Sequence, residues 1–140
     1  MPEYRPHLSA AAVHDALKGS LRELRAAKKN AVLWFGEIWQ RKLYEQRGHS
    51  SIYQYAQLEL GFSKGKTAQY LSLCRSMEHL PQLKQSVARS EIEWTKARVV
   101  AKVATPKTEK QWLAKAKSQS RRDLEQTVKR ARQDVKTRDS

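Results

Sequence analysis

Residues 50–77 of the chain read SSIYQYAQLELGFSKGKTAQYLSLCRSM, and this stretch predicts two short helices joined at a glycine. The first helix has one apolar face at helical spacing, formed by Ile52, Tyr55, Ala56 and Leu60. Gly61 follows where a helix end favours positive φ, and Ser63 can N-cap the next helix. This order predicts a helix-turn-helix with its turn near residues 60–63.

The second predicted helix has two distinct sides when successive residues are stepped by 100°. The inward side comprises Thr67, Tyr70, Leu71, Cys74 and Met77, with Ala68 and Leu73 at its margins. The outward side comprises Gly65, Gln69, Ser72 and Ser76, flanked by Lys64, Lys66 and Arg75. A polar centre with basic edges suits a helix in a DNA groove, because cations contact phosphates and a glutamine amide can bond the edge of adenine. A solvated surface helix is the alternative, and the glycine turn and the charge of the chain favour DNA.

The 140 residues include 28 Lys and Arg against 14 Asp and Glu, which gives a formal net charge of +14. The excess is spread along the chain: nine cations against five acids in residues 1–50, eight against four in 51–105, and eleven against five in 106–140. Charge of this size favours a polyanionic partner, with binding that weakens as salt rises. Nucleic acid is the partner that we expect.

Membrane and secretory functions are not indicated by the sequence. The longest apolar runs, such as residues 31–35, are far shorter than the roughly 20 residues of a membrane span. The first 20 residues lack the basic region and apolar run of a secretory signal. We therefore expect a cytoplasmic, nucleoid-associated protein, in which the single cysteine, Cys74, is a small buried thiol.

The whole chain predicts an all-α fold, since helix signals are dense and hairpin signals are absent. Ser9 can cap a first helix and Asn30 a second that ends at Gly48, or the two can form one long helix. An apolar stripe follows alternating steps of four and three residues along this region, as in a coiled coil. The stripe comprises Leu17, Leu21, Leu24, Lys28, Ala31, Phe35 and Ile38. Packing on the domain's own core and homodimerisation are equally favoured explanations.

Helix signals continue to the C-terminus. Pro81 starts a helix over residues 81–88, and another is expected over residues 94–103. Thr105 and Pro106 predict the start of a helix that ends near Lys117, with Trp112, Leu113 and Ala116 inward. Ser120 and Asp123 form a capping-box variant before a last helix that extends to about residue 132. We divide the chain into a tail (1–8), an N-terminal helix or helix pair (9–48), the helix-turn-helix with supporting helices (49–104), C-terminal helices (105–132) and a tail (133–140).

The last helix has a strongly basic face, formed by Arg121, Arg122, Lys129, Arg130 and Arg132. Such a face is most often solvated. Contact with the phosphate backbone is the alternative, which the overall charge supports.

Four segments taken in order resemble the helical region N-terminal to the nuclease module in bacterial HNH-endonuclease-like proteins. They are LGFSKGKTAQYL (60–71), Leu80-Pro81, EIEWTKAR (91–98) and ATP (104–106), and the resemblance spans residues 34–132. A weaker resemblance is to the DNA-binding domain of ParB-type partition proteins, which implies a recognition helix within residues 62–76. One departure from the usual helix-turn-helix is that Ala56 precedes Gly61 by five residues instead of four.

Catalytic patterns are absent from the sequence. His7, His14, His49, His79 and the lone cysteine do not form the clustered His or Cys pairs of a nuclease metal site. The GFSKG segment (61–65) does not match a phosphate-binding loop after a strand. We therefore expect no enzyme activity, metal or cofactor.

Together these observations predict a sequence-specific double-stranded DNA-binding protein, a transcriptional regulator or a nucleoid or partition accessory, acting as a homodimer on a palindromic site. The expected DNA contacts are Ser63, Lys64, Lys66, Thr67, Gln69, Ser72, Arg75, Arg121, Arg122, Lys129 and Arg130. The alternative is a helical protein-interaction module, or an adaptor for a separate nuclease. RNA binding is less favoured, because the chain lacks strands and an aromatic platform.

Overall fold

The computed structural model describes the backbone of residues 3–138 and the side chains of residues 3–135. This part of the chain is helical and contains no strand, which confirms the all-α prediction. The helices are α1 (Ala10–Gln40), α2 (Leu43–Gln46), α3 (Ile52–Tyr55), a π-helical turn η1 (Ala56–Leu60), α4 (Lys64–His79), α5 (Pro81–Ala88), α6 (Trp94–Ala101), α7 (Glu109–Ser118) and α8 (Arg121–Arg138).

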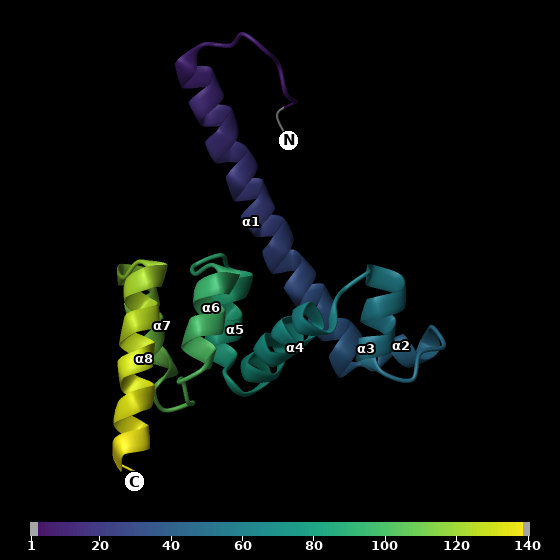
Figure 1. Cartoon of the computed structure of the whole chain (residues 1–140), viewed down its shortest axis with the longest axis vertical. Helices are drawn as coiled ribbons and strands as arrows, with labels where there is room; N and C mark the ends of the chain where they lie inside the picture. Colours follow the sequence, from purple (N-terminus) through teal and green to yellow (C-terminus); the bar gives the residue numbers. More distant parts are fainter. Residues whose placement is uncertain (1–2, 139–140) are drawn as a thin grey trace.

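Helix α1 is one continuous helix of 31 residues, so the long-helix alternative is correct as far as Gln40 and Asn30 lies inside the helix. The predicted end at Gly48 is wrong, because Lys42 adopts the left-handed conformation at φ +53° and a separate helix, α2, follows it. Ser9 caps α1 as predicted, because the Ala12 amide donates to Ser9 Oγ at 3.3 Å. Only the C-terminal half reaches the core, where Val32 and Phe35 are buried, while the N-terminal half extends beyond the other helices (Figure 1). The apolar stripe is therefore divided: its second half packs on the domain, and its first half is exposed, with Leu17 58% exposed.

The π-helical turn accommodates the extra residue between Ala56 and Gly61. Bonding to the fifth residue widens the helix there, and Gly61, at φ +70°, ends it in the left-handed region that glycine tolerates. The Phe62 amide then donates to the Ala56 carbonyl at 3.0 Å. Because this turn rotates the face, Leu60 is exposed, and its predicted inward position is wrong, whereas Ile52, Tyr55 and Ala56 are buried as predicted.

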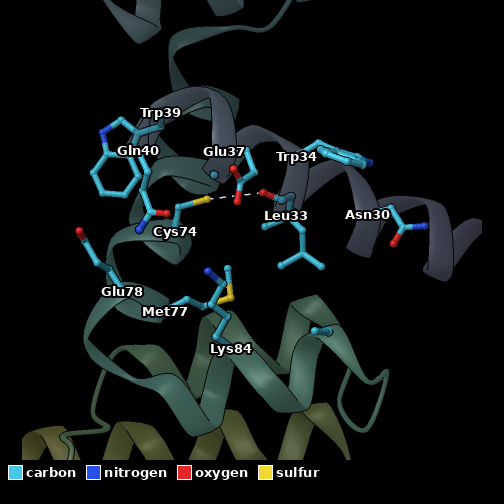
Figure 2. A pocket seen from close by; sticks show the side chains of 13 residues that line it. Asn30, Leu33, Trp34, Glu37, Trp39, Gln40, Cys74, Met77, Glu78 and Lys84 are labelled. Carbon is cyan, nitrogen blue, oxygen red and sulfur yellow. Dashed lines mark hydrogen bonds between the residues drawn. The ribbon is translucent and has the colours of Figure 1, made fainter. Parts of the chain in front are cut away.

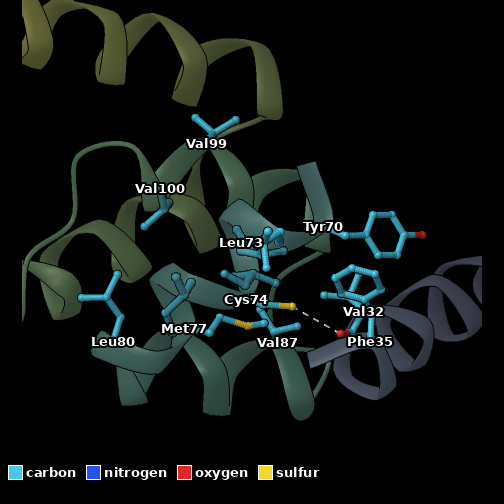
Figure 3. Packing of buried hydrophobic residues seen from close by; sticks show 14 of the residues in the cluster. Val32, Phe35, Tyr70, Leu73, Cys74, Met77, Leu80, Val87, Val99 and Val100 are labelled. Atoms are coloured by element: carbon cyan, nitrogen blue, oxygen red, sulfur yellow. Dashed lines mark hydrogen bonds between the residues drawn. The ribbon is translucent and has the colours of Figure 1, made fainter. Parts of the chain in front are cut away.

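Helix α4 is the centre of the core and packs against α1, α5 and α6 (Figure 3). All five residues predicted for its inward side are buried, and so is Leu73, whereas Ala68 is exposed. The rings of Phe35 and Phe62 lie 5.5 Å and 5.1 Å from that of Tyr70. Burial raises the pKa of Cys74 to about 11, and its Sγ donates to the Val32 carbonyl at 3.6 Å, which agrees with the expected buried thiol.

The remaining helices follow the sequence signals with three differences. Helix α6 ends at Ala101 instead of residue 103, and α7 begins at Glu109 instead of Pro106. Residues 105–108 form a turn in which the Thr105 amide donates to Thr108 Oγ1 at 2.9 Å, so Thr108 is the residue that precedes the helix. Helix α8 is capped by Ser120 as predicted but continues to Arg138, so residues 133–138 are not a tail, and residues 139–140 lie outside the described part.

None of the helices within residues 3–138 is both long and apolar enough to cross a membrane.

Glu109 is a buried acid that connects α7 to α5. Glu109 is only 2% exposed, and its carboxylate accepts a hydrogen bond from the Leu83 amide at 3.3 Å. Leu83 is in the first turn of α5, where Leu80 offers no side-chain cap. Glu109 therefore supplies from a distant helix the cap and the negative charge that a helix N-terminus favours.

We predict that Glu109→Ala lowers the free energy of unfolding by about 1–3 kcal/mol, because it leaves the buried Leu83 amide without its acceptor. Urea denaturation of the variant and the wild type measures this difference. Gln111→Ala, an exposed change on the same helix, is the control and should be near neutral. A loss no larger than that of the control would contradict the capping role.

Candidate nucleic-acid interface

The N-terminus of α4 is well ordered by its own sequence. Ser63 Oγ accepts from the Lys66 amide at 3.1 Å, and the Ser63 carbonyl accepts from the Thr67 amide at 3.0 Å. Lys64 and Lys66 extend from this first turn and are exposed. The free amides and the dipole of a helix start add to these two charges, so this end of α4 attracts anions.

The outward side of α4 is half of a groove whose other half is α6. Gln69, Ser72 and Ser76 face the groove from α4, and Arg98 of α6 and Lys102, which directly follows α6, face it from the other side. At its N-terminal end the groove adjoins a second hollow, which Gln69 shares with Lys66 of α4, Lys28 of α1 and Trp94 of α6. We call these eight residues the α4/α6 groove: Lys28, Lys66, Gln69, Ser72, Ser76, Trp94, Arg98 and Lys102.

Trp94 holds two cations of the groove near each other. Lys28 Nζ lies 5.8 Å from the centre of the Trp94 ring, and Arg98 Cζ lies 5.3 Å from it. Each distance is within the range of a cation–π interaction, which offsets some of the repulsion between the two side chains. The groove therefore has cations from α1, α4 and α6 around the amide of Gln69.

The exposed residues among the predicted contacts on α4 divide into two groups. Lys66, Gln69 and Ser72 line the groove, as expected for outward residues. Lys64 and Arg75 are exposed but line neither hollow, since they lie on the flank of α4 away from α6.

Two predicted contacts are engaged within the protein. Ser63 is exposed, but its hydroxyl is used as the cap of α4. Thr67 is only 1% exposed, and its hydroxyl donates to the Ser63 carbonyl at 3.0 Å. A contact from Thr67 to DNA is therefore wrong, because the side chain is part of the core.

The basic face of α8 meets the groove only in part. Lys129 and Arg132 share a hollow with Lys102 at the end of α6, so they extend the row of cations from the α4/α6 groove. Helical periodicity places Arg122, seven residues before Lys129, on the same side, and turns Arg130 away by about 100°.

Arg121 pairs with Glu125 at 3.5 Å on the exposed surface, where such a pair contributes little to stability. It remains exposed and accessible to a phosphate.

The ion pairs of the surface lie outside the groove and have structural explanations. Glu59 pairs with Arg47 and with His49, and these partners hold its pKa below the usual value. Glu91 pairs with Lys117 at 3.1 Å, which lowers its pKa, and Glu93 pairs with Arg25 at 3.5 Å. Among the described residues no group of three or more His, Cys, Asp or Glu side chains is placed to hold a metal ion.

Sequence reasoning missed Lys28, Trp94, Arg98 and Lys102. Trp94 is half-buried, and the centre of its ring lies 5.8 Å from that of the Tyr70 ring. The other three lie in segments far from the glycine turn and have no local pattern that marks them. Only the packing of α1 and α6 against α4 brings them to Gln69.

Comparison with known proteins gives no match to a family model, to a curated protein or to a solved structure.

We predict that Thr67→Val lowers stability by about 1 kcal/mol without changing the affinity for a polyanion. The substitution keeps the side-chain shape but removes the hydrogen bond to the Ser63 carbonyl. Urea denaturation and heparin affinity measure the two quantities. Ser72→Ala is the control, because it removes an exposed hydroxyl and should change the free energy of unfolding little. If Thr67→Val is fully folded but binds heparin more weakly than the wild type, Thr67 contacts the polyanion after all.

Proposed function

We propose that this chain is a non-catalytic protein that binds double-stranded DNA through the α4/α6 groove, as a transcriptional regulator or a nucleoid or partition accessory. The observation that supports this most is the gathering of Lys28, Lys66 and Arg98 from three helices around the exposed amide of Gln69. The net charge of +14 supports it as well, since the field of the whole chain attracts a polyanion before contact.

In the proposed complex the cations position the protein and the polar residues discriminate bases. Lys28, Lys66, Arg98 and Lys102 contact phosphates, which contributes affinity without sequence preference. Gln69 donates to and accepts from the edge of an adenine in the major groove, and Ser72 bonds an adjacent base. Lys129 and Arg132 lengthen the phosphate contact along α8.

This mode differs from a helix-turn-helix in which α4 alone enters the DNA. Because α6 flanks the outward side of α4, the two helices must contact DNA together, and the flank with Lys64 and Arg75 contributes less. The proposal also includes a homodimer. A single module buries limited surface on DNA, and a two-fold dimer on a palindromic site doubles it.

The test compares the affinity for a random duplex DNA pool between the wild type and the triple variant Lys66→Ala/Gln69→Ala/Arg98→Ala. We expect binding that is weaker by roughly 10- to 100-fold and a slope of log affinity against log salt that is smaller by about two, because two phosphate contacts are lost. The matched control is Lys107→Ala/Lys110→Ala/Gln111→Ala. It also removes two positive charges and one amide, but from three exposed residues outside the groove. Equal affinities of the two triple variants would refute the assigned groove.

A second comparison separates the groove from insertion of α4 alone. Lys64→Ala/Arg75→Ala removes two charges from the same helix but from the flank away from α6. If the α4/α6 groove is the interface, this double variant binds DNA several-fold more tightly than Lys66→Ala/Arg98→Ala. If α4 enters the groove of DNA by itself, the two double variants lose equal affinity. Selection of bound sequences from random duplexes then tests Gln69 through loss of preference at one position.

The second candidate function is a helical interaction module or an adaptor for a separate nuclease. The observation that favours it is the exposed apolar half of α1, which a pure DNA-binding module does not need. Under this function duplex DNA binds weakly and without sequence preference, so the selection experiment yields no consensus.

A further inference from the structure

Two apolar surfaces of this chain have no counterpart within the described part of the molecule. The first is the α1 arm, which we define as residues 10–24 with the exposed side chains Val13, Leu17, Leu21 and Leu24. The second is the α1/α4/α5 groove, whose walls include Leu33, Trp34, Glu37, Trp39, Met77 and Glu78. Figure 2 shows this groove, with Leu33 and Trp34 on α1 and Met77 across from them.

We propose that the α1 arm of a second copy of this chain occupies the α1/α4/α5 groove, and that two copies exchange arms reciprocally. This inference specifies the homodimer within the proposed function, and its test does not depend on DNA. Trp34 is 72% exposed although it borders the groove, so a large apolar ring is available to a partner. Exposed apolar surface of this kind marks an interaction site.

The contact must form between two molecules. Helix α1 is unbroken from Ala10 to Gln40, so its N-terminal arm cannot fold back to the groove at its own C-terminal half. A surface and its complement that cannot meet within one chain can meet only in an assembly.

Charge favours the groove as the seat of the arm. The groove has Glu37 and Glu78 on its walls and one cation, Lys84, although the chain as a whole is strongly basic. Helical projection places Lys18, and Arg25 just beyond the arm, along one edge of the apolar stripe, with Asp15 on the opposite side of the helix; Arg25 also makes an exposed ion pair with Glu93. Attraction between this basic edge and the two carboxylates fixes the orientation of the arm.

Pairing of two arms with each other is less favourable. Lys28 follows Leu24 as the next residue of the stripe and is exposed, so two stripes paired in parallel would bring two lysines together there. The remaining apolar residues span less than the three to four heptads that a coiled coil typically uses. The groove instead offers the arm the apolar side chains of Leu33, Trp34, Trp39 and Met77.

The geometry allows a closed dimer. The middle of the arm and the groove are separated by about 15 residues of α1, or roughly 22 Å along the helix. If the α1 helices of two copies run antiparallel and cross midway between the arm and the groove, the arm of each copy reaches the groove of its partner. This arrangement has two-fold symmetry. Ala16, Ser20 and Ala27 lie on the face of α1 between the stripe and the groove, and their small side chains allow a close crossing.

Sedimentation equilibrium of the full chain tests the proposal. We expect the wild type to dimerise, and we expect two variants to raise the dissociation constant by about tenfold or more: the arm variant Leu17→Ser/Leu21→Ser and the groove variant Trp34→Ala. Charge reversal by Glu37→Lys/Glu78→Lys should weaken the dimer at low salt, whereas Glu45→Lys/Glu125→Lys, with the same change of charge at exposed sites elsewhere, should not. Circular dichroism and urea denaturation confirm that each variant is folded.

Mixing the arm variant with the groove variant gives the most specific result. A mixed dimer has one intact contact, from the arm of the groove variant to the groove of the arm variant, so native mass spectrometry should detect it above either homodimer. Wild type that stays monomeric, or a Trp34→Ala dimer as tight as the wild type, overturns the proposal. Lys66→Ala/Gln69→Ala/Arg98→Ala should retain the dimer, so loss of the DNA function and loss of the arm exchange are distinguishable.

Discussion

The close packing of α1 on α4 is the contact on which the rest of the structure depends. A Cβ atom added at Gly36 would lie 3.4 Å from Cys74 Sγ, so the glycine permits the two helix axes to approach. One residue away, Phe35 meets the edge of the Tyr70 ring at 5.5 Å, and the Val32 carbonyl accepts from the Cys74 thiol. This contact buries one half of α1 and leaves the other half outside the domain. It also orients α4 so that Gln69 and Ser72 face α6 and Glu78 lies on the opposite side.

Local signals predicted most of the helix starts, because a cap depends on residues within one turn. Ser9, Ser63 and Ser120 each accept the amide hydrogen bond that their position predicted, and Pro81 begins α5. The start of α7 was wrong because Thr105 and Thr108 bond each other and form a separate turn before the helix. The predicted inward position of Leu60 was wrong because the prediction assumed α-helical spacing throughout. Residues 56–60 form a π-helical turn, which changes the direction in which Leu60 points.

The candidate interface was half predictable for the same reason. The outward side of α4 follows from the periodicity of residues 64–79, so Lys66, Gln69 and Ser72 were found from the sequence. Lys28 lies about forty residues before Gln69 in the sequence and Arg98 about thirty residues after it, and only tertiary packing brings them to α4. The net charge indicated a polyanionic partner but did not indicate which of the 28 cations gather in one place.

Helix α4 separates two surfaces of different character. Its polar side, with α6, is surrounded by cations, and its other side, with α1 and α5, is apolar with two carboxylates on the walls. Under the proposed function, a polyanion is attracted to the first surface, and the α1/α4/α5 groove, which has two carboxylates and only one cation, Lys84, on its walls, stays available to a protein partner. Because the same rigid helix forms part of both surfaces, a subunit seated in one groove fixes the direction in which the other groove faces. Dimerisation would therefore set the spacing between the two DNA contacts. The length of α1 would determine that spacing, because it determines how far apart the two domains lie.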